Sequence, residues 1–148
     1  YKVPMNEEKL KGKHLIFYDG ICSLCNRSII FVFNRDKNDQ FIVVQLQSKQ
    51  ATVLLKNYME FDSEKLNSVA LIKHFGTENE QFYTKSTASL SILEACIGYK
   101  TLAKILLKFP KFLRDFVYDV IAISRYQVFG KFDKCPVPDP KFRKKVIS

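Results

Sequence analysis

Glycine and proline are scarce in this sequence of 148 residues, which contains only five of each. So few turn-forming residues argue against a fold dominated by loops. Long apolar runs are also missing, and none approaches the roughly 20 residues that a membrane-spanning helix needs. The first ten residues are polar and lack the hydrophobic stretch of a secretory signal peptide. These absences predict a soluble cytoplasmic protein, in which thiols stay reduced unless they turn over.

Motifs for metal or nucleic-acid binding are equally sparse. The four cysteines and two histidines form only one close pair, Cys22 and Cys25. A structural zinc site usually takes four ligands from two such pairs. No groove-reading or phosphate-binding motif accompanies the net charge of +9, and a basic balance alone selects no partner. We therefore expect neither a bound metal nor a nucleic-acid partner.

The residues that are abundant favour one globular domain. Apolar residues make up 47% of the chain, including 13 Phe and 7 Tyr. A chain of this length can bury a full core without metal or disulfide cross-links. We interpret the polar residues 1–12 as an N-terminal extension and residues 13–148 as a single domain.

Strand and helix patterns alternate along the domain and then give way to helices alone. Short apolar or β-branched runs predict strands, and apolar residues at helical spacing predict helices. The order β-α-β-α, β-β-α, then further helices fits an α/β fold. We expect a four-stranded mixed sheet flanked by helices, with extra C-terminal helices. The predicted strands are 13–19, 41–44, 68–75 and 81–84, and the predicted helices are 22–34, 48–58, 88–97, 101–109 and 112–124.

The dithiol Cys22 and Cys25 is the strongest functional signal. Both residues lie at the start of a predicted helix that directly follows the first strand, one turn apart on one face. Unpaired N–H groups and the helix dipole favour a thiolate at Cys22. We expect Cys22 to exchange with substrate, and Cys25, one turn inside and more buried, to resolve the mixed disulfide. Inert packing of two small side chains and a zinc site remain alternatives.

Asp19 precedes this dithiol and complicates its electrostatics. A carboxylate near Cys22 would oppose thiolate formation. Asp19 could instead accept a proton from Cys25, hydrogen-bond the turn, or simply form a turn with Gly20.

Three blocks of the sequence resemble the DCC family of predicted thiol–disulfide oxidoreductases, which is named for an Asp-x-x-Cys-x-x-Cys run. The blocks are Asp19 with Cys22 and Cys25, then Tyr83-Thr84-Lys85-Ser86-Thr87-Ala88, and then Arg125-Tyr126-Gln127-Val128-Phe129-Gly130-Lys131 followed by Cys135. The resemblance runs from about residue 13 to residue 135. It implies a thioredoxin-like fold and disulfide exchange with a protein or low-molecular-weight thiol, reset by a reductase or oxidant partner. The family's physiological substrates are largely unassigned.

Two features bear on how a substrate would bind. Thioredoxins place a cis-proline before the third strand, opposite the dithiol, whereas the matching stretch here, residues 67–69, contains no proline. Ser86 and Thr87 are expected to cap the next helix, whose N-terminus could alternatively hold an anion. In glutaredoxin-like proteins the equivalent helix start holds a glutathione carboxylate, so glutathione is a candidate co-substrate by analogy. We expect no cofactor beyond the Cys22–Cys25 disulfide itself.

The C-terminal block is predicted to pack beside residues 19–25 and shape the substrate cleft. Arg125 would then offset the charge of Asp19, Tyr126 and Phe129 would limit access to the sulfur, and Cys135 could act as a third redox thiol. The alternative is a structural cluster at a helix end. A second functional hypothesis is a thioredoxin-fold binding module with an idle dithiol, which docks a partner through its basic amphipathic helices. We do not expect those helices to contact a membrane surface.

Overall fold

The computed structural model describes residues 10–36, 39–46, 48–56, 69–96, 98–130 and 146–147. Strands and helices alternate in the first part of the chain, and three helices follow its fourth strand. The strands are β1 (His14–Tyr18), β2 (Phe41–Gln45), β3 (Ala70–Lys73), β4 (Gln81–Thr84) and β5 (Val146–Ile147). The helices are α2 (Ser23–Asn34), α3 (Lys49–Leu55), α4 (Lys85–Glu94), α5 (Lys100–Leu107) and α6 (Lys111–Phe129).

The strands form one mixed sheet in the order β4-β3-β1-β2-β5. β1 pairs in parallel with β2, because α2 crosses over between them, and β3 runs antiparallel to both β1 and β4. The predicted four-stranded mixed sheet of a thioredoxin-like α/β fold is thus confirmed. The two-residue strand β5, which pairs in parallel with β2, is an addition that the sequence did not predict.

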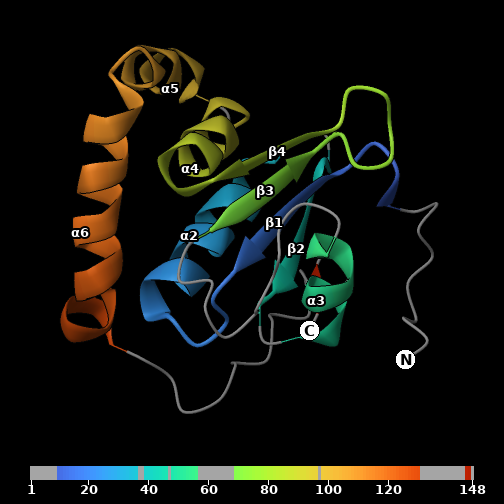
Figure 1. Ribbon diagram of the computed structural model, residues 1–148, viewed down its shortest axis with the longest axis horizontal. Helices are drawn as coiled ribbons and strands as arrows, with labels where there is room; N and C mark the ends of the chain where they lie inside the picture. The colour runs from blue at the N-terminus through green and yellow to red at the C-terminus, as the bar shows by residue number, and fades with distance from the viewer. Residues whose placement is uncertain are drawn as a thin grey trace.

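Each face of the sheet is covered by helices, so β1 is buried along its whole length. Ile16 and Tyr18 belong to a core under α2 and α4, whereas Leu15 and Phe17 belong to a core under α3. Figure 1 shows α2 and α4 on one side of the sheet and α3 on the other. Burial of each such side chain stabilises the fold by about 1.5–3 kcal/mol. Leu10, within the predicted N-terminal extension, is also buried in the second core.

Helix α6 lies at the edge of the molecule beside α4 and α2 (Figure 1). Its outward side chains include Phe112, Phe116 and Ile123, which are 78%, 66% and 79% exposed. The buried member of this helix is Arg125. α6 therefore turns mainly polar residues toward the domain and most of its large apolar residues toward solvent. No helix in the described part of the chain is long and apolar enough to cross a membrane.

Candidate functional site

A tight turn at the end of β1 carries the sequence from Asp19 to Cys22. The Asp19 carboxylate accepts a hydrogen bond from the backbone N–H of Ile21 at 3.1 Å, and its carbonyl accepts one from Cys22 at 3.2 Å. The Asn26 amide spans the turn, donating to the carbonyls of Gly20 at 2.8 Å and Cys22 at 2.9 Å. The structure thus contains the hydrogen bond from the turn to Asp19 that the sequence suggested. Asn26 of α2 stabilises the same turn through its side-chain amide.

Cys22 is the N-cap residue of α2. Its backbone is extended, and its Sγ accepts a hydrogen bond from the Cys25 N–H, with a nitrogen–sulfur distance of 3.4 Å. This places the Cys22 sulfur at the unpaired N–H groups of the helix start, where negative charge is favoured.

The relative burial of the two thiols is the reverse of the sequence prediction. Cys22 is fully buried, whereas Cys25 is partly exposed, so the prediction that Cys25 is the more buried is wrong. The reason is tertiary: the end of α6 lies against this turn, and the Ser23 N–H donates to the Gly130 carbonyl at 3.4 Å. A helix start considered by itself cannot reveal that another helix covers it.

Cys25 has an electrostatic environment that keeps its thiol protonated. Burial raises the pKa of Cys25 strongly, and its hydrogen bond with Cys22 and the charges of Cys22 and Asp19 raise it further. Arg125 acts in the opposite direction on this pKa. At neutral pH the Cys25 thiol is therefore protonated.

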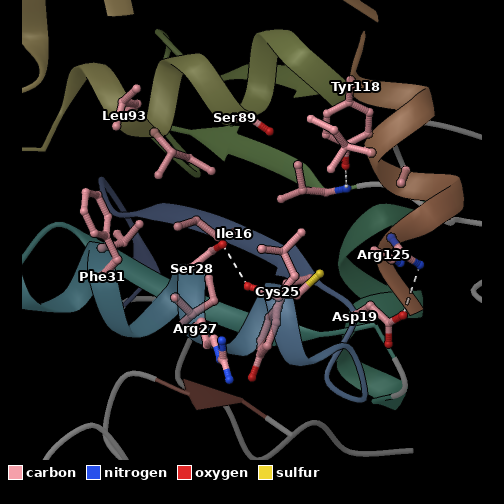
Figure 2. Close-up of a pocket in the computed structure, with 18 of the residues that line it drawn as sticks. Ile16, Asp19, Cys25, Arg27, Ser28, Phe31, Ser89, Leu93, Tyr118 and Arg125 are labelled. Atoms are coloured by element: carbon pink, nitrogen blue, oxygen red, sulfur yellow. Dashed lines mark hydrogen bonds and ion pairs between the residues drawn. The ribbon is translucent and has the colours of Figure 1, made fainter. Parts of the chain in front are cut away.

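A buried ion pair joins the turn to α6. The Arg125 guanidinium lies 3.1 Å from the Asp19 carboxylate, and both side chains are less than a tenth exposed (Figure 2). The Tyr126 hydroxyl donates to the same carboxylate oxygen. Burial and this hydrogen bond raise the pKa of Tyr126. The structure thus brings Arg125 and Tyr126 to Asp19, where the C-terminal block was expected to pack.

The outcomes for the remaining predicted cleft residues differ. Phe129 is 41% exposed at the end of α6, and Cys135 lies outside the described residues. Ser86 and Thr87 do not cap α4, whose N-cap is Thr84 and makes no side-chain capping bond. The helix begins earlier than predicted because Lys85 continues directly from β4 through a left-handed backbone, with φ of 52°.

The start of α4 is occupied by a carboxylate of the chain itself. Ser86 donates its hydroxyl to Asp115 of α6, and hydrogen bonds from Ser86 lower the pKa of Asp115. Thr87 accepts a hydrogen bond from Arg114 at 3.4 Å. The position that the sequence suggested for a bound anion therefore holds Asp115.

The edge before β3 is also occupied by α6. The Val69 N–H donates to the Tyr118 hydroxyl at 2.9 Å, and the Val69 carbonyl accepts from Lys85 at 3.1 Å. Burial raises the pKa of Tyr118. Sequence reasoning missed Tyr118 and Asp115. The available signal was the spacing of Asp115, Tyr118 and Arg125, which lie on one face of α6 opposite its apolar residues.

A cavity of about 570 Å³ adjoins the dithiol, between α2, α4 and α6. Cys25 and Tyr118 line it, and Figure 2 shows both side chains at the end nearer α6. The remaining lining is mainly apolar and includes Ile16, Leu24, Ile29, Phe31, Val32, Leu90, Ile92, Leu93, Cys96, Ile121 and Ala122. The exposed side chains of Arg27 and Ser28 also line the cavity, so it opens to solvent. Within the described residues, no group of three His, Cys, Asp or Glu side chains is placed to hold a metal ion.

The fold and the turn together define a thioredoxin-like protein with a Cys-x-x-Cys pair at the first helix. Residues 16–131 match the family of DCC1-like thiol–disulfide oxidoreductases. The chain belongs to this family, as the resemblance of its three sequence blocks predicted.

Two relatives are similar over most of the chain. YuxK of Bacillus subtilis (strain 168), described as an uncharacterized protein, is 34% identical over 143 residues, which cover 97% of this chain and 99% of the relative. A chloroplastic DCC family protein of Arabidopsis thaliana is 34% identical over 122 residues, covering 82% of this chain and 67% of the relative. No solved structure matches the chain significantly.

Proposed function

We propose that this protein exchanges a Cys22–Cys25 dithiol for a disulfide with a thiol or disulfide substrate. The observation that carries the proposal is the hydrogen bond from the Cys25 N–H to the Cys22 sulfur at the start of α2. It stabilises negative charge on one sulfur, while burial keeps the neighbouring thiol of Cys25 protonated. A dithiol with one thiolate-stabilising and one proton-holding position suits disulfide exchange.

The bonds, electrons and protons exchanged between protein and substrate balance. When the protein acts as reductant, a Cys22–Cys25 bond forms and the substrate disulfide breaks, through a mixed disulfide with one of the cysteines. Two electrons and two protons pass to the substrate, which leaves as two thiols. A thiol reductant resets the pair, and the reverse sequence oxidises a substrate dithiol. A reducing compartment such as the cytoplasm suits the reductant direction, because there the resting pair is a dithiol.

Asp19 enters this proposal as a positioning residue. Its carboxylate holds the turn before Cys22 and binds Arg125 and Tyr126 from α6. The positive charge of Arg125 offsets the negative charge of Asp19. Asp19 therefore opposes the formation of a thiolate in the dithiol less strongly.

The test is a redox titration in a chain whose only thiols are Cys22 and Cys25. In a Cys96→Ala, Cys135→Ser background, mixtures of reduced and oxidised dithiothreitol should convert the pair to a disulfide, detected as the loss of two hydrogens by mass spectrometry. Adding Cys22→Ser or Cys25→Ser should abolish the two-hydrogen loss while circular dichroism shows a folded chain. Absence of a disulfide at any ratio of the mixture in the folded background protein would overturn the proposal.

A second candidate function is a binding module with an idle dithiol. The observation that favours it is the exposed apolar face of α5 and α6, with Leu102, Ile105 and Phe112 each about half exposed or more. Isolated exposed apolar side chains are ordinary, but a contiguous apolar face marks an interaction surface. The same titration separates the two functions, because an idle dithiol would not cycle reversibly with dithiothreitol.

A further inference from the structure

We propose that the substrate of this dithiol is a small thiol or disulfide with an uncharged, apolar body, which binds in the cavity beside Cys25. This inference rests on the proposed function and names its substrate class. It excludes a charged peptide such as glutathione and an extended protein strand as the preferred substrate.

The cavity has the size and character of a small-molecule site. Its volume of about 570 Å³ lies within the roughly 300–1,000 Å³ typical of ligand pockets, and its walls are mainly apolar. The redox sulfur that lines it is that of Cys25, whereas Cys22 is fully buried and does not line it. A molecule in this cavity therefore reaches the dithiol from the Cys25 side, with its body against apolar side chains.

At the edge before β3, the first described residue is Val69, and its backbone groups already have partners within the chain. A strand that binds along this edge needs main-chain hydrogen bonds to the residue before β3. Both groups of Val69 are already used, its N–H by Tyr118 and its carbonyl by Lys85. A protein strand would have to displace Tyr118, and with it α6, before it could pair there.

The nearby helix start offers no site for a substrate carboxylate either. The Asp115 carboxylate accepts a hydrogen bond from the Ser86 hydroxyl at the start of α4, and Ser86 is buried. A second carboxylate placed there would meet the negative charge of Asp115. With these two docking points occupied from α6, recognition depends mainly on the apolar walls of the cavity, whose polar lining includes Arg27 and Ser28.

The reaction in the cavity follows the balance already given, with Cys25 as the attacking sulfur once its proton has passed to the neighbouring Cys22 sulfur. An apolar disulfide is reduced to two thiols while the Cys22–Cys25 bond forms, and dithiothreitol supplies the electrons for further turnovers. The experiment compares reduction of an uncharged aromatic disulfide, 4,4′-dithiodipyridine, with reduction of hydroxyethyl disulfide and oxidised glutathione. Each rate is divided by the rate of the same disulfide with free dithiothreitol, which corrects for intrinsic reactivity.

We expect the corrected rate for dithiodipyridine to exceed the other two by about tenfold or more, since filling an apolar pocket is worth at least that much. Ala122→Phe, which places a ring in the cavity, should bring the ratio toward one. The matched control is Ile123→Phe on the same helix, where the side chain is 79% exposed, and it should keep the wild-type ratio. If Ala122→Phe does not fold, Ser89→Leu replaces it, because the larger side chain narrows the cavity from α4 and should also bring the ratio toward one.

The outcomes separate this inference from the proposed function. Equal corrected rates for the three disulfides, or a ratio unaffected by both cavity variants, would overturn the apolar substrate class and leave dithiol exchange intact. A folded protein that reduces none of the three would overturn the proposed function itself.

Discussion

Removal of the Arg125 charge should destabilise the protein far more than removal of a surface charge from the same helix. Arg125→Met keeps an apolar side chain of similar length but leaves the Asp19 carboxylate buried without its cationic partner, while the hydrogen bonds from Ile21 and Tyr126 stay in place. Both members of the ion pair are less than a tenth exposed. Loss of one partner from a buried pair costs about 3–5 kcal/mol, a large part of the roughly 5–15 kcal/mol that stabilises a domain.

The assay is urea unfolding followed by circular dichroism, with Asp119→Asn as the matched control. Asp119 lies on the same helix and pairs with Lys85 at 3.2 Å, but these two side chains are 47% and 42% exposed. Loss of such a pair costs about 0–1 kcal/mol. The double variant Asp19→Asn, Arg125→Met should be more stable than the sum of the two single losses predicts, because it leaves no unpaired buried charge. Equal losses for Arg125→Met and Asp119→Asn, or strict additivity in the double variant, would refute the reasoning.

Two further predictions concern buried polar groups. Burial, together with the charges of His74 and Lys73, lowers the pKa of His14 from 6.5 to about 4, and its Nδ1 accepts a hydrogen bond from the His74 N–H. The unfolded chain therefore binds the proton first, so stability should fall by up to about 3 kcal/mol as the pH drops from 6.5 to about 4, and His14→Gln should flatten this dependence in urea titrations. Tyr118→Phe removes the acceptor of the Val69 N–H and should cost about 1–3 kcal/mol. Amide exchange should be faster at Val69 in this variant, and unchanged protection there would contradict the assigned bond.

The sequence predicted those parts of the structure that depend on neighbours along the chain. The apolar run at residues 14–18 was sufficient to predict β1, and the helical spacing after Cys22 was sufficient to predict α2. Both predictions succeed because the spacing of apolar residues depends only on the local backbone structure. The Asp-Gly turn and the position of Cys22 at a helix start followed in the same way. Pro110 correctly separated the last two helices, where it is the N-cap of α6.

The features of the site that the sequence could not predict depend on where α6 packs. The burial of Cys22 and the occupation of the Val69 N–H arise from residues about 50 to 110 positions away in the chain. The expected cap at Ser86 failed because the serine hydroxyl binds Asp115 of that helix. α6 also reverses the usual amphipathic rule, since its polar face packs on the domain and Phe112 and Ile123 face solvent.

Three of the polar contacts of α6 also constrain how a substrate can enter. Asp115, Tyr118 and Arg125 bind three separate elements, namely the start of α4, the edge before β3 and the turn before Cys22. A substrate that used any of those polar groups would have to break the corresponding contact, and at Arg125 it would also leave the buried Asp19 charge without its partner. A substrate that enters the cavity under α6 breaks none of them. Because Cys25 lines the cavity, a substrate there reaches the dithiol with those three contacts intact.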